Sequence, residues 1–472
     1  MQKPLKIRLH VLSPIHIGCD DVYEPMSFAI DEKKQKLIEF DPLEFIKSLS
    51  QEDRQRLTEI CMQGNISSIV SIYKFISGRQ VKGGEVEIAK GLITHYNNVK
   101  KLPINDEKKI KQELNQFTIS RTAYNPHNNL PYIPGSSLKG SLRTAYLSKL
   151  ARDKTVTKYE GKAKDLEIEL LGGSFATDPF RMVKVSDFLP VGDVKTKIVY
   201  AVNKKKKTSK FEARGPFQIL ETVKEGSVFE GIINIQQPEK KSGIQEPIQA
   251  TEFLKSINDF YIPAVNDENK VTREINASSV VVSRINEKFK GILGKTAFLL
   301  RIGRHSGAEA VTIEGNRYIK IMQAKGQQPK FLDHATTIWL ASEESNPTTN
   351  NGLMPFGWAV MELLPLDIEN LYPASIVKEK PAIMEPIKTE TKAITEKPAP
   401  QTIIWESAIL TWSPGNRILK AEKDGKKAEL KISDKSLVPE TMRKKLFDKK
   451  KSVAAKVTVE QTGNAYKILR IE

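Results

Sequence analysis

Residues 373–402 constrain the fold of this 472-residue chain more than any other stretch of it. They hold five prolines and alternating charges, and they contain no aromatic side chain. Because such a composition buries too little apolar surface to build a core, it is typical of a semi-extended linker. The linker predicts that a body over residues 1–372 and a tail over residues 403–472 fold separately.

The body combines strand-like and helical patterns. Apolar and polar residues alternate over residues 5–11, which predicts a first strand, whereas helical spacing with good capping residues dominates residues 41–115. Further strands are expected at 195–202, 226–236, 296–303 and 358–364, and further helices at 135–147, 252–260 and 273–290. Because strands and single helices interleave twice, we predict an α+β body of two units, 1–200 with a helical insertion and 201–372.

The tail has a different pattern of expected elements, with short strands and one basic helix. The expected elements are strands at 405–412, 417–424 and 426–433, a helix at 439–451 and a hairpin at 456–471. The dipeptides Asp424-Gly425 and Gly463-Asn464 favour tight hairpin turns. Three strands, a helix and two strands in so short a segment predict a small all-β barrel of the OB type.

The charge balance points to a polyanionic partner. Lys and Arg number 74 against 57 Asp and Glu, which gives a net charge of +17. Such a surplus favours nucleic acid or an anionic membrane surface, although a merely soluble basic protein has the same signature. No apolar run approaches the ~20 residues that a membrane-spanning helix needs. From the charge, we expect nucleic acid as the partner.

Cysteine usage excludes two further classes of protein. Cys19 and Cys61 are the only cysteines in the sequence, too few for a disulfide framework or a Cys-based zinc site. The sequence has no pair of carboxylate or histidine clusters with metal-ligand spacing. Its first residues do not resemble a signal peptide. We therefore expect a cytoplasmic protein without a metal or another cofactor.

Residues 131–146, PYIPGSSLKGSLRTAY, form the motif with the most chemical content. A Pro-Gly turn would deliver backbone N–H groups to a helix N-terminus, which binds anions readily. Lys139 and Arg143 are four residues apart and would lie on one face of that helix. The motif predicts a phosphate-binding helix end, and an ordinary capped helix with a solvated basic face is the alternative. The candidate contacts are Gly135, Ser136, Ser137, Lys139, Gly140 and Arg143.

Two further segments are candidates for phosphate contacts. Six cations fall within eleven residues between two expected strands: Lys204, Lys205, Lys206, Lys207, Lys210 and Arg214. They predict either a basic hairpin loop laid against RNA or a solvated charge run. In RIGRHSG, Gly303 and Gly307 would let the backbone approach a phosphate. Arg304 would grip that phosphate and His305 would stack on a base, with a plain glycine turn as the alternative.

The helix motif PYIPGSSLKGSLRTA resembles the signature helix of the RAMP superfamily in type III CRISPR effector complexes. Further segments also resemble the family: LSPIHIGCDD (12–21), the strand pair at 215–233, the glycine-rich region at 301–315 and the last strand at 352–363. Their order and spacing resemble the subunit of type III-A (Csm) complexes that caps the 3′ end of the CRISPR RNA. The resemblance covers most of residues 1–365 but neither the linker nor the tail.

The resemblance implies a fold and a set of partners. The fold is two ferredoxin-like units of the RNA-recognition type. The partners are CRISPR RNA, a backbone RAMP subunit, a small helical subunit and a trimming nuclease, in a role in guide maturation and antiviral defence without catalysis. His16 and Gly18, at the turn after the first strand, would then face RNA, and the basic run at 204–214 would act as a thumb against it.

Two alternatives remain open. Related RAMP proteins include metal-independent endoribonucleases, whose chemistry needs a base and an acid around a 2′-OH. The candidate groups for it are His16, His127, His305 and His334. Because nothing in the sequence brings two of them together, we favour a binding protein. The second alternative is the same fold in a type III-B (Cmr) complex.

Overall fold

The computed structural model describes residues 4–364 and 401–471, apart from 208, 210–212, 214, 324–325, 414–417, 432–437, 449–451 and 463–464. The chain forms two compact units, residues 1–376 and 377–472, with separate hydrophobic cores. The predicted body and tail therefore fall in different units. Residues 373–400 of the predicted linker lie outside the described residues.

The first sheet of the body is antiparallel and runs in the order β12-β17-β1-β11-β7, with β8 also paired to β11. Its strands are β1 (Leu5–Val11), β7 (Val183–Val185), β8 (Leu189–Pro190), β11 (Val228–Ile235), β12 (Ala297–Arg301) and β17 (Trp358–Leu364). Leu9 stands opposite Phe229 on one side and Met361 on the other, and all three side chains are buried. The predicted strand at 5–11 is thus the centre of the sheet.

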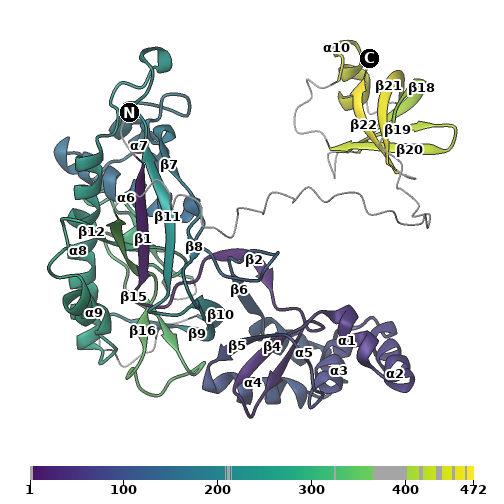
Figure 1. Ribbon diagram of the computed structural model, residues 1–472, viewed down its shortest axis with the longest axis horizontal. Helices are drawn as coiled ribbons and strands as arrows, with labels where there is room; N and C mark the ends of the chain where they lie inside the picture. Colours follow the sequence, from purple (N-terminus) through teal and green to yellow (C-terminus); the bar gives the residue numbers. More distant parts are fainter. Residues whose placement is uncertain are drawn as a thin grey trace, which may run out of the picture. The chain divides into compact units, whose positions relative to one another are not determined.

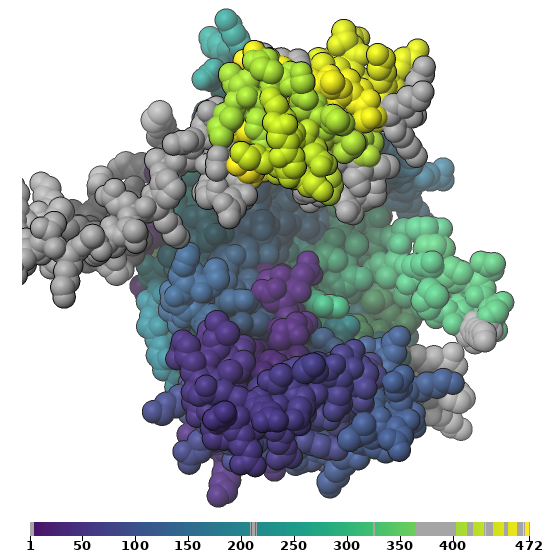
Figure 2. All heavy atoms as spheres, turned by 90° about the vertical axis from the view of Figure 1, so that its right-hand side faces the viewer, coloured from purple at the N-terminus to yellow at the C-terminus, as the bar shows by residue number. Residues whose placement is uncertain are grey.

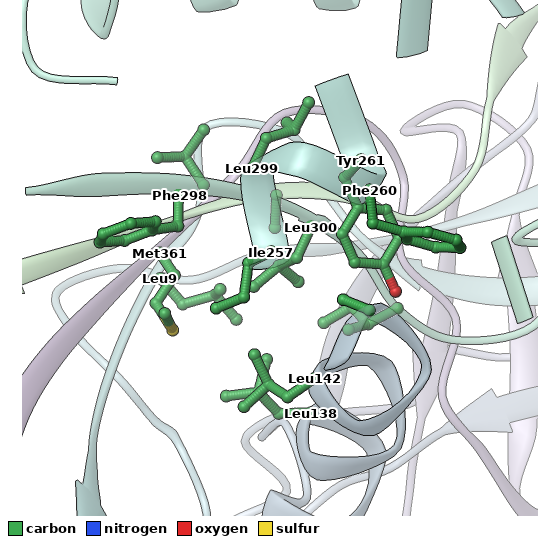
Figure 3. Packing of buried hydrophobic residues seen from close by; sticks show 14 of the residues in the cluster. Leu9, Leu138, Leu142, Ile257, Phe260, Tyr261, Phe298, Leu299, Leu300 and Met361 are labelled. Carbon is green, nitrogen blue, oxygen red and sulfur yellow. The ribbon is translucent and has the colours of Figure 1, made fainter. Parts of the chain in front are cut away.

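Two long helices pack on this sheet. They are α6 (Gly135–Asp153), which follows β1 and precedes β7 along the chain, and α8 (Ala250–Glu274), which follows β11 and precedes β12. Figure 3 shows Leu138 and Leu142 of α6 and Ile257 and Tyr261 of α8 in the same buried cluster as Leu9 of β1. Each helical pair is four residues apart, so both of its side chains lie on the face that the sheet buries.

A second sheet is assembled from segments inserted between elements of the first. Its strands are β2 (Gly18–Val22), β3 (Phe28–Asp31), β4 (Lys36–Glu39), β5 (Gly84–Ile88), β6 (Ile119–Thr122), β9 (Thr196–Lys205), β10 (Gln218–Val223), β15 (Thr337–Ser342) and β16 (Met354–Pro355). Along the chain, β2 to β6 lie between β1 and α6, β9 and β10 between β8 and β11, and β15 and β16 between β12 and β17. The order is β2-β6-β10-β9-β5-β4-β3, with β15 also paired to β9.

This arrangement differs from the expected division of the body at residue 200. That position falls inside β9, and both sheets take strands from both sides of it. The strand pair expected at 215–233 is also divided, because β10 belongs to the second sheet and β11 to the first. Alternation of apolar and polar residues indicates that a segment is a strand, but it does not indicate which strand that segment pairs with.

The helical block expected at 41–115 is present. Its helices are α1 (Pro42–Ser48), α2 (Gln51–Met62), α3 (Ile66–Ile76), α4 (Lys90–Lys100) and α5 (Glu107–Gln116). Asp41 and Ser50 cap α1 and α2 by accepting backbone N–H groups, as their sequence positions predict. Strand β5 interrupts the block, and Figure 1 shows the helices beside β4 and β5. In Figure 2 the same segments, in purple to blue, mass together on one face.

Helix α8 continues through Pro263 instead of ending near residue 260. Its buried residues Phe253, Ile257, Tyr261 and Val265 line one face on both sides of the proline, so packing outweighs the missing N–H. The helix expected at 273–290 is shorter, α9 (Val280–Lys288). The remaining elements of the body are α7 (Ala163–Leu171), β13 (Ile319–Ile321), β14 (Lys330–Leu332) and the short helices η1 (Pro179–Met182), η2 (Lys240–Ser242) and η3 (Ala308–Val311). None of the helices in the described ranges is long and apolar enough to cross a membrane.

The tail unit is a closed barrel with the order β18-β19-β20-β22-β21. Its elements are β18 (Gln401–Ser413), β19 (Ile418–Lys423), β20 (Lys426–Lys431), α10 (Glu440–Arg443), the π-helical turn η7 (Lys444–Asp448), β21 (Val453–Thr462) and β22 (Ala465–Ile471). Strand β20 runs parallel to β22, and the other pairs are antiparallel. Asp424 and Gly425 both have positive φ, 49° and 74°, as the tight turn expected there requires. The turn expected at Gly463-Asn464 lies outside the described residues.

Candidate nucleic-acid interface

The glycine-rich segment after β12 packs directly on the turn after β1. Gly303 has a φ of 84°, and a Cβ added to it would lie 2.5 Å from the His16 carbonyl oxygen. The Arg304 N–H donates to that oxygen at 2.8 Å. Two segments about 290 residues apart in the sequence are therefore joined through backbone contacts that tolerate only glycine at position 303.

His16 itself cannot reach a ligand on the surface. Its side chain is fully buried, and Nδ1 lies 2.7 Å from the Glu221 carbonyl oxygen. Burial lowers the pKa of His16, so the ring is neutral. The expected RNA contact at His16 is thus replaced by a structural role, because the turn after β1 is covered by β10 and the glycine-rich segment. Gly18, at the start of β2, is exposed.

His305 is also occupied within the protein. Its ring stacks on Trp339 with centroids 4.5 Å apart and an interplanar angle of 29°, and Nε2 lies 3.0 Å from Gln218 Oε1. Burial and the nearby Arg304 charge lower the pKa of His305 to about 3. The ring expected to stack on a base therefore stacks on Trp339 instead. Arg304 is exposed and makes no ion pair among the described residues, and Gly307 nearby is exposed as well.

The N-terminus of α6 is filled by the protein's own groups. The Gly135 N–H donates to Asp187 Oδ1 at 2.8 Å, and a Cβ on Gly135 would lie 2.4 Å from the Val185 carbonyl oxygen. Ser136 is exposed and Ser137 is half-buried. Because a carboxylate already caps this helix end, it is not the open phosphate site that the motif predicts.

The two cations of the α6 motif have different surroundings. Arg143 is paired with Glu167 at 2.8 Å and Asp178 at 2.9 Å, so its role is to hold α6 to the following segments. Lys139 has no ion pair in the described part of the chain, and the charges that act on it are those of Lys184 on β7, Asp178 and Arg143. Burial, and then the Lys184 charge, lower the pKa of Lys139.

Lys184 was not among the residues expected from the sequence. It lies in the Val-Lys-Val strand β7, where alternation predicts an outward side chain but not a neighbour on α6. Gly140, the residue after Lys139, is exposed, and a Cβ on it would meet nothing within 4 Å. Lys139 and Lys184, which we call the α6–β7 lysine pair, therefore add positive charge to the surface that Asp178 offsets only in part.

The basic run at 204–214 does not begin as a loop. Lys204 and Lys205 lie in β9 and pair with β15. Lys204 Nζ donates to the Pro347 carbonyl at 3.3 Å, and Lys206 Nζ is paired with Glu309 at 2.5 Å. Lys207 is exposed, and it lines a polar cavity of about 400 Å³ together with Lys204 and Lys205. Lys210 and Arg214 lie outside the described residues.

Three comparisons connect this fold with known proteins. The RAMP superfamily model matches residues 8–308. A curated protein, the CRISPR system Cms protein Csm5 of Methanocaldococcus jannaschii, is 22% identical over 406 residues, covering 76% of this chain and 89% of that protein. A chain from the cryo-EM structure of a Csm-crRNA-target RNA ternary complex in a type III-A CRISPR-Cas system is 19% identical, with a TM-score of 0.49 over 76% of this chain and 100% of that chain.

The crystal structure of T. onnurineus Csm5 is similar at 16% identity, with a TM-score of 0.43 over 75% of this chain and 99% of that chain. The family model covers more than half of the chain, from β1 through the glycine-rich segment that packs on His16. The segments on which the sequence resemblance rests fall largely within the same range. The protein belongs to the RAMP superfamily.

Proposed function

We propose that this protein is a non-catalytic CRISPR RNA-binding subunit of a type III-A complex, which caps the 3′ region of the guide and supports its maturation. The observation that carries the proposal is the α6–β7 lysine pair. Lys139 is partly buried beside the charge of the exposed Lys184, and the Asp178 carboxylate that acts on Lys139 is shared with Arg143, so the positive charge is only partly compensated and raises the free energy of the folded protein. A phosphate placed between the two lysines would offset that cost, and exposed Arg304 would add a further contact.

The similar proteins support the assignment to this kind of complex. The curated relative is named as a Csm protein, and its matched region spans most of both chains. The partners we propose are the guide RNA in the cytoplasm, a backbone RAMP subunit, a small helical subunit and a trimming nuclease. The order β17-β1-β11-β7 with α6 and α8 between successive strands supports a ferredoxin-like unit in the first sheet.

The tail supports a more specific assignment as well. We propose that the tail is an OB-type barrel. Its strand order, its parallel β20–β22 pair and its helix between β20 and β21 support this assignment. Trp405 is buried in its core, and Trp412 and Tyr466 are half-buried against that core. The aromatic residues are therefore mainly core residues, and RNA binding by the tail would rest on its lysines.

Measurement of guide RNA affinity against salt concentration tests the proposed function. Lys139→Ala combined with Lys184→Ala should reduce the slope of log affinity against log salt by about 1.4, because each lost phosphate contact removes about 0.7 for a single strand. At 0.15 M salt this corresponds to roughly tenfold weaker binding. Thermal stability should stay the same or rise, since a repulsive pair is removed.

The matched control is Lys47→Ala combined with Lys270→Ala. These exposed lysines are paired with Glu44 and Asp267, and the double variant loses the same net charge. If the control and the α6–β7 variant weaken binding equally, the effect is one of net charge and the proposed phosphate site is absent. No binding of guide RNA by the unmodified protein would overturn the proposed function as a whole.

We also expect the purified protein to leave precursor and target RNA intact. General acid–base cleavage needs one group that donates a proton and one that accepts it, and histidines fill these roles most often. His16 and His305 are neutral and buried or half-buried, with their rings held by Glu221, Gln218 and Trp339, so neither can supply a proton near pH 7. A single-turnover assay with EDTA checks this expectation. Cleavage that disappears in His305→Ala while RNA binding is retained would contradict it.

A further inference from the structure

A short hairpin between β12 and β15 carries large apolar side chains into solvent. Tyr318 is 75% exposed, Met322 74% and Phe331 41%. In this hairpin Lys320 of β13 stands opposite Phe331 of β14, so these two side chains share a face, and alternation extends that face to Tyr318 and Met322 on either side of β13. In Figure 2 the hairpin is the green segment that projects from the body. We call the face that bears Tyr318, Lys320, Met322 and Phe331 the hairpin face.

The two aromatic rings of the hairpin face form an open-ended stack. The Tyr318 and Phe331 ring centroids are 4.2 Å apart, and the rings are within 8° of parallel. One face of each ring is covered by the other ring, and the high exposure of Tyr318 leaves its outer face to solvent. A third planar group can therefore continue the stack at Tyr318, and Met322 on the same face adds a polarisable contact.

The charges around the rings are mainly positive. Lys320 and Lys330 are exposed, and neither makes an ion pair within the described residues. Asp333 follows β14, but its carboxylate is engaged with His334 at 2.6 Å. Parallel rings with the unpaired Lys320 ammonium group on the same face match a nucleobase with a neighbouring phosphate, whereas Lys330 stands opposite Ile321 and lies on the other face. An apolar protein surface would bury the Lys320 ammonium group without a partner, which costs free energy.

The root of the hairpin is held firmly to the body. Glu309 accepts hydrogen bonds from Lys206 Nζ at 2.5 Å and from the Ala335 N–H at 2.7 Å. Its carbonyl oxygen accepts from Arg317 Nη2 at 3.2 Å. These contacts fix both ends of the hairpin, so the ring stack is presented from a defined position. They also explain the burial of Lys206, which the charge run alone did not predict.

We propose that the hairpin face is a base-stacking platform for single-stranded RNA, with a nucleobase on the outer face of Tyr318 and a backbone phosphate at Lys320. The inference rests on the proposed function, because it names a second contact of the same RNA. Its stacking contact depends on aromatic rings and is largely independent of salt, unlike the contact at the α6–β7 lysine pair.

Binding of a fluorescently labelled single-stranded RNA by the full-length chain tests the platform. Tyr318→Ala should weaken binding about five- to 150-fold, the range for loss of one base stack, with an unchanged salt slope. Tyr318→Phe should keep nearly full affinity. Tyr318→Leu should not, because it keeps apolar area but removes the planar ring. Met62→Ala is the matched control, since Met62 is an 80% exposed side chain on α2 and should have no effect.

A second readout uses RNA that contains 2-aminopurine. Its fluorescence should be quenched on the unmodified protein and on Tyr318→Phe, but not on Tyr318→Leu. If RNA binds and loses affinity in the Lys139/Lys184 variant, yet Tyr318→Ala binds equally well, the platform is wrong and the proposed function stands. Equal tolerance of Phe and Leu would mean an apolar protein contact and would overturn the platform. No RNA binding by the unmodified chain would overturn both.

Discussion

Replacing Glu268 by alanine should lower the stability of the body by about 3–5 kcal/mol, the usual cost of removing one partner of a buried ion pair. Glu268 of α8 binds Arg301 Nη1 at 2.5 Å and Trp358 Nε1 at 2.6 Å, and the Arg301 side chain is 5% exposed. Loss of the carboxylate would leave the buried Arg301 guanidinium without a counter-charge, with only its Nε–H bonded to the Phe356 carbonyl, and the Trp358 indole N–H without an acceptor. Chemical denaturation, monitored by tryptophan fluorescence, measures the change in the free energy of unfolding.

Two variants separate charge from packing in this result. Glu268→Gln keeps an acceptor for Trp358 and should cost less than the alanine variant. Adding Arg301→Met to Glu268→Ala should recover part of the lost stability, because no buried charge then remains. Full stability of Glu268→Ala alone would show that water or another group already solvates Arg301, contrary to the burial described here.

Gly303→Ala should destabilise the body by about 2–5 kcal/mol. A positive φ costs a residue with a Cβ about 1–2 kcal/mol, and at Gly303 the added atom would also lie 2.5 Å from the His16 carbonyl oxygen. Forcing an atom into such a packed position typically costs about 1–3 kcal/mol more. The joint between the turn after β1 and the glycine-rich segment should therefore loosen, and the exposed Arg304 beside it should lose its position.

Gly226→Ala is the matched control for this substitution. Gly226 has a φ of 87°, close to the 84° of Gly303, but a Cβ on it would meet nothing within 4 Å. It should show the conformational cost alone, about 1–2 kcal/mol. Equal losses of unfolding free energy in the two variants would mean that the His16 joint yields easily and does not constrain the segment.

Much of the local structure could be predicted from the sequence. The capping residues Asp41 and Ser50 and the helical spacing that follows them locate α1 and α2. Alternation locates β1 and β11, and the Asp-Gly dipeptide locates the turn between β19 and β20. These features depend on residues within a few positions of one another, so their physical causes are present in any short window of sequence.

The pairing of strands could not be predicted from the sequence in the same way. The segment at 215–233 is correctly expected to contain two strands, yet β10 and β11 lie in different sheets. Helix α8 passes Pro263 because a buried face on the far side of the proline compensates for the lost hydrogen bond. In both cases the outcome is set by packing against segments far away in the sequence.

The candidate site shows the same division most clearly. The sequence alone established the residue types: a basic chain, lysines and arginines in motifs, and glycines where the backbone approaches closely. Only the tertiary structure decided which cations remain for a ligand. Arg143 is neutralised by Glu167 and Asp178, and Lys206 by Glu309, which is 103 residues away. Lys139 instead meets Lys184. The charge of a side chain is a local property, but whether a carboxylate reaches it depends on the fold, because Coulomb attraction acts through space and not along the chain.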